Sequence, residues 1–196
     1  MHFTPSRALL AAGAMIAGLT LAPRPAHATD FYVQALATGG GSTWEDDPNI
    51  QGGLHLGFEF ADIFSVEGMA RMGYANIDQR LLLLLGFAIK AAIPIDPVSP
   101  YLRLGAIHMH EESVAGMKTD PFLHFVGVGD AIRHRFGVET AAGIDIRLFK
   151  KPIGGDSGRT LGLFGVVEAT IDIFPDEKGP LVYGGATTGI AFQYGL

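Results

Sequence analysis

Apolar and polar residues alternate along most of this chain. Over residues 136–149, one set of alternate positions is apolar or threonine, and the other holds glycines, alanine, phenylalanine and the charged residues Glu139, Asp145 and Arg147. Successive side chains of a β-strand point to opposite faces, so a period of two predicts a strand. The same period predicts eight strands, at residues 30–39, 53–60, 63–74, 80–93, 101–110, 136–149, 160–174 and 181–196.

The connections between these segments predict a topology of antiparallel hairpins. Turns at one end are predicted at residues 61–62, 94–100 and 150–159, and connections at the other end near Trp44, Ile77, Lys118 and Glu177. The longest connection is predicted over residues 111–134. In segment 101–110, Arg103 indicates that odd residues point inward, but Ile107 and Met109 fit either face, so a β-bulge there is an alternative.

Composition, taken together with this alternation, predicts the fold class. Hydrophobic residues make up 48% of the chain and charged residues only 17%, with 27 glycines and no cysteine, so disulfides are excluded. The longest apolar run beyond the N-terminus, 81–89, ends at Lys90, well short of the roughly 20 residues that a transmembrane helix needs. Hydrophobicity spread over short alternating segments is typical of a transmembrane β-barrel. We therefore predict an all-β fold, an eight-stranded antiparallel up-and-down transmembrane β-barrel.

The N-terminus predicts export. Arg7 precedes the apolar run 8–19, and residues 26–28 form a small-x-small cleavage site, so residues 1–28 are predicted to be a secretory signal peptide. Residues 29–196 are then the barrel domain. Removal of Arg7 and Arg24 changes the formal net charge from −6 to −8. This acidic balance argues against a nucleic-acid partner.

The polar face of the strands is predicted to line the barrel lumen. A basic residue on the lipid face at mid-depth costs about 2–4 kcal/mol, whereas the lumen tolerates charge. The predicted lumen polar network consists of Glu59, Glu67, Arg71, Lys90, Arg103, Glu139, Asp145, Arg147, Glu168 and Asp172. Met69, Leu82, Leu84 and Phe164 share the inward phase. Since an eight-stranded barrel is just wide enough for its side chains, a packed lumen is favoured over a conducting pore.

Several segments together are similar to a known group. They are PYLRLGA at 100–106, FGVETAAGIDIRL at 136–148, and the alternation of Ile190, Phe192 and Tyr194 in the last segment. With these segments the chain resembles the small outer-membrane β-barrels of Gram-negative bacteria, of OmpA type and opacity type. The resemblance implies location in the outer membrane, with membrane structure, surface display, adhesion or slow solute passage as roles. It also implies that the barrel-assembly machinery reads the last strand, which ends here in Leu196 rather than an aromatic residue.

One cluster could carry metal chemistry. Alternation places His108, His110 and Glu112 on one side of a strand, and two imidazoles with a carboxylate are suitable zinc ligands. The alternative, which we favour, is a polar strand end at the headgroup boundary, so neither a metal nor a cofactor is expected. Catalysis is not expected either, because Ser113 lies at odd spacing from both histidines and no G-x-S-x-G motif occurs.

Two kinds of contact surface are predicted. Trp44, Phe122, Leu123 and Phe125 are candidates for contacts of external loops, so a surface partner could bind the loop 111–134. Tyrosines near strand ends are predicted to form an interfacial girdle in contact with outer-membrane lipid, namely Tyr32, Tyr74, Tyr101, Tyr183 and Tyr194.

The functional prediction is therefore an outer-membrane barrel with a structural or surface-interaction role through its external loops. The first alternative is a narrow passive channel for small solutes. The second is a periplasmic lipocalin-like barrel that binds an apolar ligand. That second barrel would require Leu81, Leu83, Leu85 and Phe87 inside and the charged residues outside.

Overall fold

The computed structural model describes residues 30–43, 47–60, 63–115, 132–154 and 158–195. The predicted signal peptide 1–28 and the loop candidates Trp44, Phe122, Leu123 and Phe125 lie outside these residues. Within them, no helix is long and apolar enough to cross a membrane.

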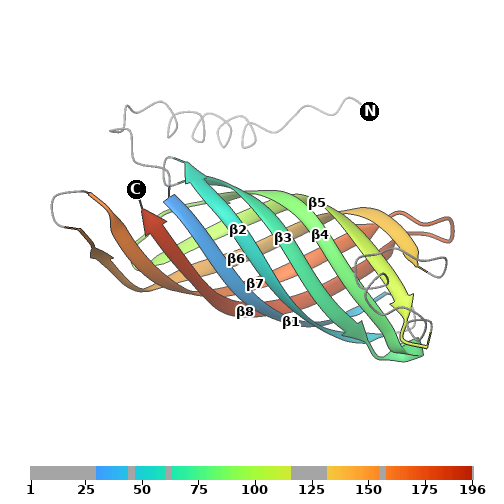
Figure 1. Ribbon diagram of the computed structural model, residues 1–196. Coiled ribbons are helices and arrows are strands. Elements are labelled where there is room, and N and C mark those ends of the chain that lie inside the picture. The colour runs from blue at the N-terminus through green and yellow to red at the C-terminus, as the bar shows by residue number, and fades with distance from the viewer. Residues whose placement is uncertain (1–29, 44–46, 61–62, 116–131, 155–157, 196) are drawn as a thin grey trace, which may run out of the picture.

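Eight antiparallel strands close into a barrel in which each strand pairs with its neighbours in sequence, and the first with the last (Figure 1). The strands are β1 (Asp30–Ser42), β2 (Pro48–Phe60), β3 (Phe64–Ala75), β4 (Arg80–Ala92), β5 (Val98–Ser113), β6 (Arg133–Pro152), β7 (Thr160–Phe174) and β8 (Leu181–Gly195). A 3-10 turn, η1 (Ile77–Gln79), joins β3 to β4. The predicted eight-stranded antiparallel barrel is confirmed.

The two ends of the barrel are named here for reference. Asp30 pairs with Gly195, so β1 starts and β8 finishes at the same end, which we call the terminal end (Figure 1). The connection between β5 and β6 is at the opposite end, which we call the long-loop end.

Several strands are longer than the alternation predicts. β2 starts at Pro48 instead of 53, and β5 and β6 continue until Glu111 pairs with Arg133. The predicted bounds of the loop 111–134 are therefore wrong at both ends, because the connection between β5 and β6 spans 114–132. Backbone pairing continues past the point where apolar residues stop alternating, because ladder hydrogen bonds do not depend on side-chain hydrophobicity. β5 keeps a regular register, and the described shift lies in β6, between Arg147 and Phe149.

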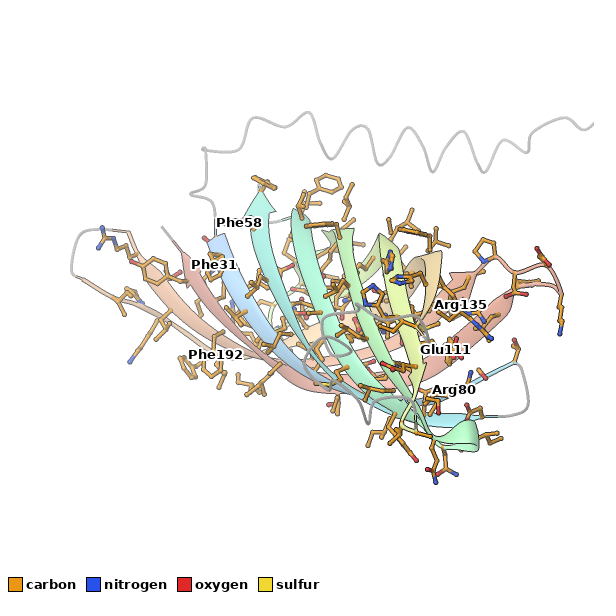
Figure 2. The ribbon with its side chains drawn as sticks, turned by 45° about the vertical axis from the view of Figure 1, so that its right-hand side comes forward. Phe31, Phe58, Arg80, Glu111, Arg135 and Phe192 are labelled. Carbon is orange, nitrogen blue, oxygen red and sulfur yellow. The ribbon has the colours of Figure 1, made fainter. Side chains whose placement is uncertain are left out.

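The outer face of the barrel is apolar. Phe87 is 75% exposed and Leu102 67% exposed, whereas Glu67 and Glu139 are fully buried. Figure 2 shows Phe31, Phe58 and Phe192 on this outer face toward the terminal end. The lipocalin-like alternative is therefore wrong, because it requires Leu81, Leu83, Leu85 and Phe87 inside, whereas Leu85 is 45% exposed and Phe87 75% exposed.

Apolar side chains fill part of the lumen. The larger cluster includes Met69, Leu82, Leu84 and Met109, together with Phe174 of β7 and Leu181 and Tyr183 of β8. In a smaller cluster, Leu36, Val166 and Ala191 pack together, with Phe164 against them. The interior therefore contains two apolar clusters besides its charged side chains.

Candidate functional site

Two tyrosines form the edge of the polar interior. Tyr32 and Tyr101 are each 4% exposed and point into the lumen, so their assignment to an interfacial girdle is wrong. Tyr183 is also buried, while Tyr74 faces outward. The rings of Tyr32 and Tyr101 lie so close to Gly57 and Gly143 that a Cβ atom there would fall within 2.2 Å and 2.6 Å of ring atoms. Glycine on the neighbouring strand makes room for each ring.

The hydroxyl groups explain why these tyrosines are inside. Tyr32 donates a hydrogen bond to Glu67 and lies 2.8 Å from the hydroxyl of Ser65. Tyr101 donates to Glu168 Oε2 at 2.6 Å. A buried tyrosine hydroxyl needs a polar partner. Each of these two hydroxyls has a carboxylate as its partner, and each gives that carboxylate an additional hydrogen-bond donor.

Arg103 on β5 is the centre of the interior charges. Its Nη1 and Nη2 atoms donate to the two oxygens of Glu168, both at 2.8 Å, which is a bidentate pair. Its Nε donates to Glu139 Oε1 at 2.8 Å, and Nη1 lies 3.6 Å from Glu67 Oε2. One guanidinium thus contacts three carboxylates from β3, β6 and β7.

Arg71 on β3 extends the cluster toward the long-loop end. Its Nη2 lies 2.6 Å from Glu139 Oε2 and 3.0 Å from Asp172 Oδ2. Glu139 therefore joins the two arginines, and Arg71 links β3 to β6 and β7 across the lumen. A small pocket on this side of Arg71, lined also by Asp172 and Tyr183, has a volume of about 10 Å³, which is at the lower limit for one water molecule.

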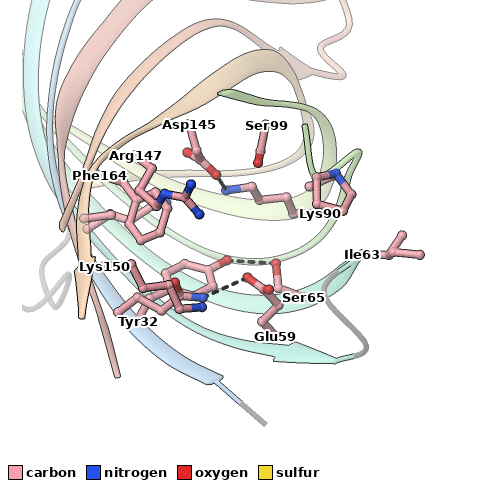
Figure 3. A pocket seen from close by; sticks show the side chains of 15 residues that line it. Tyr32, Glu59, Ile63, Ser65, Lys90, Ser99, Asp145, Arg147, Lys150 and Phe164 are labelled. Atoms are coloured by element: carbon pink, nitrogen blue, oxygen red, sulfur yellow. Dashed lines mark hydrogen bonds and ion pairs between the residues drawn. The ribbon is translucent and has the colours of Figure 1, made fainter. Parts of the chain in front are cut away.

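Lys90 on β4 closes the cluster toward the terminal end. Its Nζ lies 2.5 Å from Asp145 Oδ2 and 4.0 Å from the centre of the Tyr101 ring, in a cation–π contact. Beyond it, a cavity of about 350 Å³ opens at the terminal end, lined by Tyr32, Lys90, Asp145 and Arg147 among others (Figure 3).

We call these residues the central network. Its members are Tyr32, His55, Glu67, Arg71, Lys90, Tyr101, Arg103, Glu139, Asp145, Glu168 and Asp172. Its five carboxylates outnumber its three cations, and His55 Nδ1 lies 3.4 Å from Glu67 Oε2. Sequence analysis missed the role of His55, Tyr32 and Tyr101. The available signals were the inward phase of His55 and that of Tyr101, which is two residues before Arg103.

Two residues of the predicted lumen network lie outside this cluster. Glu59 is half-buried near the terminal end and accepts a hydrogen bond from Gln193 Nε2 at 3.3 Å. Arg147 pairs with Asp96, which lies in the turn between β4 and β5. Their strands and phase agree with the prediction, but they lie beyond Lys90 and do not contact the arginines in the described pairs.

A second charged cluster closes the long-loop end, and sequence analysis did not identify it. Arg80 pairs with Asp47 and Glu111. Arg135 donates to Glu111 Oε2 at 3.0 Å and to Asp176 Oδ2 at 2.5 Å. Figure 2 shows Arg80, Glu111 and Arg135 close together at this end. We call these five residues the rim cluster. It joins two connecting segments to β4, β5 and β6.

The rim cluster predicts how Asp176 titrates. A hydrogen bond from Arg135 lowers the pKa of Asp176 below the aspartate value of about 3.9. Since the folded-state pKa is the lower one, the contact stabilises the fold at neutral pH and is lost as the pH falls through that pKa. We expect Arg135→Gln to raise the pKa toward its ordinary range in a carbon-13 NMR titration, with the hydrogen bond from the Lys178 backbone N–H still in place. An unchanged pKa in this variant would show that Arg135 is not the cause.

Three histidines lie together on the outer face of the barrel. His108 and His110 on β5 lie beside His134 on β6, and the ligand nitrogens of all three are within 4.8 Å of one another. The third member of this histidine cluster is His134 and not the predicted Glu112, which is a buried residue on β5. His134 directly opposes His110 across the two strands. Sequence analysis had no means to pair residues across the longest connection.

Comparison with known proteins finds similarity in the structure and not in the sequence. No protein-family model and no curated protein matches the chain. The N-terminal β-barrel domain of Pseudomonas aeruginosa OprF covers 84% of this chain and 96% of its own, at 14% identity and a TM-score of 0.50. Neisserial surface protein A covers 86% of this chain and 98% of its own, at 11% identity and a TM-score of 0.55. The chain has the fold of the small outer-membrane barrels. At these identities, the likeness concerns the fold alone.

Proposed function

We propose that this protein is an integral outer-membrane β-barrel with a non-conducting lumen. Its role is to hold the connections at its long-loop end at the cell surface. The observation that carries the proposal is the inverted distribution of side chains. Apolar residues such as Phe87 and Leu102 are exposed outside, and charged residues such as Glu139 are buried inside. This is the arrangement that hydrocarbon around the barrel requires.

The packing of the lumen favours a structural role over passage of solutes. Arg103 and Arg71 join opposite walls of the barrel through Glu139, Glu168 and Asp172. The cavity at the terminal end reaches this network, whereas the pocket beside Arg71 has room for about one water molecule. A solute would have to break several buried charge pairs to pass.

The proposed orientation places the terminal end in the periplasm and the long-loop end outside the cell. Its support is the longer connection 114–132, because external loops of such barrels are generally longer than periplasmic turns. On this proposal, the partners are outer-membrane lipid, the barrel-assembly machinery acting on the last strand, and a surface partner for 114–132. We expect no catalytic activity.

The test is single-channel conductance of refolded protein in planar bilayers. We expect no discrete steps from protein that shows the gel shift on boiling typical of folded barrels. Discrete ohmic steps from such protein would contradict the non-conducting lumen and favour the narrow channel. In that event Arg71→Gln should change ion selectivity, whereas Arg147→Gln near the terminal end should change it less.

A further inference from the structure

The histidine cluster has the geometry of a metal site. His108 Nε2 lies 3.2 Å from His134 Nδ1, and the ring centres of His110 and His134 are 4.7 Å apart. Ligands bound to one zinc ion at about 2.0–2.1 Å in tetrahedral geometry have nitrogen atoms about 3.3–3.5 Å apart. The three rings therefore need only small side-chain rotations to bind one ion.

The register of β5 and β6 sets this geometry. His110 and His134 are directly opposed, and His108 opposes Phe136. His108 and His110 share a face because they are two residues apart on one strand. The three imidazoles thus come from two strands whose pairing continues almost to the connection 114–132, so the backbone holds them without help from that connection.

The surroundings leave the cluster accessible from water. His134 is exposed, and it lines an open hollow of about 680 Å³ together with Arg133 and residues 175–178. Arg133 and Ser113 at the strand ends are also exposed. On the terminal-end side, Phe136 is 72% exposed and packs edge-on against the His108 ring at 4.2 Å between ring centres. The cluster therefore lies where the apolar outer face ends.

We propose that His108, His110 and His134 bind a divalent transition-metal ion, with Zn²⁺ as the physiological candidate. Neutral imidazole suits zinc, copper and nickel, and three histidines leave a fourth position open for water or an external ligand. The ion would clamp β5 to β6 at the base of the connection 114–132. Without a metal ion, hydrogen bonds between neutral imidazoles would also hold the three rings together. The experiment distinguishes a metal site from such a hydrogen-bonded cluster.

The experiment is titration of Zn²⁺ into refolded, tag-free protein in detergent micelles, with isothermal titration calorimetry as the measurement. A tag-free chain is essential because a polyhistidine tag binds the same ions. We expect one ion per barrel with micromolar or tighter affinity, and weaker binding at acidic pH, because protons compete with the metal ion for the imidazole nitrogens. His108→Gln, His110→Gln and His134→Gln should each weaken binding at least about 10-fold.

The matched control is Phe136→Leu, which removes the neighbouring ring and keeps all three imidazoles. It should leave the affinity within a few-fold of the unsubstituted chain, and the gel shift on boiling checks that each variant folds. Electron paramagnetic resonance of a Cu²⁺-loaded sample gives a second readout, with hyperfine coupling to three nitrogens. Binding weaker than millimolar, or an affinity in all three histidine variants equal to that of the unsubstituted chain, would overturn the proposal.

Discussion

Replacement of Arg103 by methionine should lower the free energy of unfolding by about 3–5 kcal/mol. Arg103 is 2% exposed and contacts Glu67, Glu139 and Glu168. Its loss leaves buried carboxylates with fewer charge partners, and breaking a buried pair costs more than the pair itself contributes. Glu168 is affected most, because it would keep only the hydroxyl of Tyr101 among its described partners.

Urea-induced unfolding of the protein in lipid vesicles measures this loss. Arg147→Met is the matched control, because the Arg147 side chain is 35% exposed and pairs with the exposed Asp96. An exposed pair typically contributes about 1 kcal/mol or less. Glu168→Gln in the Arg103→Met background should restore part of the stability by removing one uncompensated charge. Equal losses at Arg103 and Arg147 would contradict the central role of Arg103.

Replacement of Phe87 by arginine should cost about 2–4 kcal/mol in a lipid bilayer. Phe87 is 75% exposed and lies midway along β4, where it pairs with Gly68 and Ala106. An arginine there would lie in hydrocarbon unless its side chain reached a membrane surface. The expected cost rests on the proposed membrane location and tests it independently of conductance.

The control for this second prediction is Ile93→Arg. Ile93 is 64% exposed but follows the last residue of β4, so its arginine should cost only about 0–1 kcal/mol at the membrane interface. Both variants are measured in the same vesicles by the same unfolding transition. A similar small cost at both positions would show that the outer face does not contact hydrocarbon.

The sequence predicted the two faces of each strand, because a period of two depends only on neighbouring residues. Phe87 and Leu102 were expected outside, and both are exposed. Alternation could not assign the tyrosines, since a ring with a hydroxyl suits either an interface or a polar interior. The partners of Tyr32 and Tyr101 became evident only when Glu67 and Glu168 were placed across the lumen.

The sequence pattern could not predict contacts between strands that are distant in sequence. Arg103 and Glu168 are 65 positions apart. They meet because both side chains point into the narrow lumen, from strands that do not pair directly. The histidine cluster depends on register even more strongly. A shift of one residue between β5 and β6 would place Arg133 or Arg135 opposite His110, in place of His134. No local pattern determines that shift.

Closure of the barrel has a consequence for the order in which it folds. Seven of the eight strand pairings join neighbours in sequence and can form as local hairpins. The β1–β8 seam instead joins positions such as Thr38 and Thr187, which are 149 residues apart and share a 2.7 Å hydrogen bond. Loop-closure entropy makes such pairing slow. In the proposed membrane location, two unpaired edges would face hydrocarbon until the seam forms, so closure and insertion would occur together.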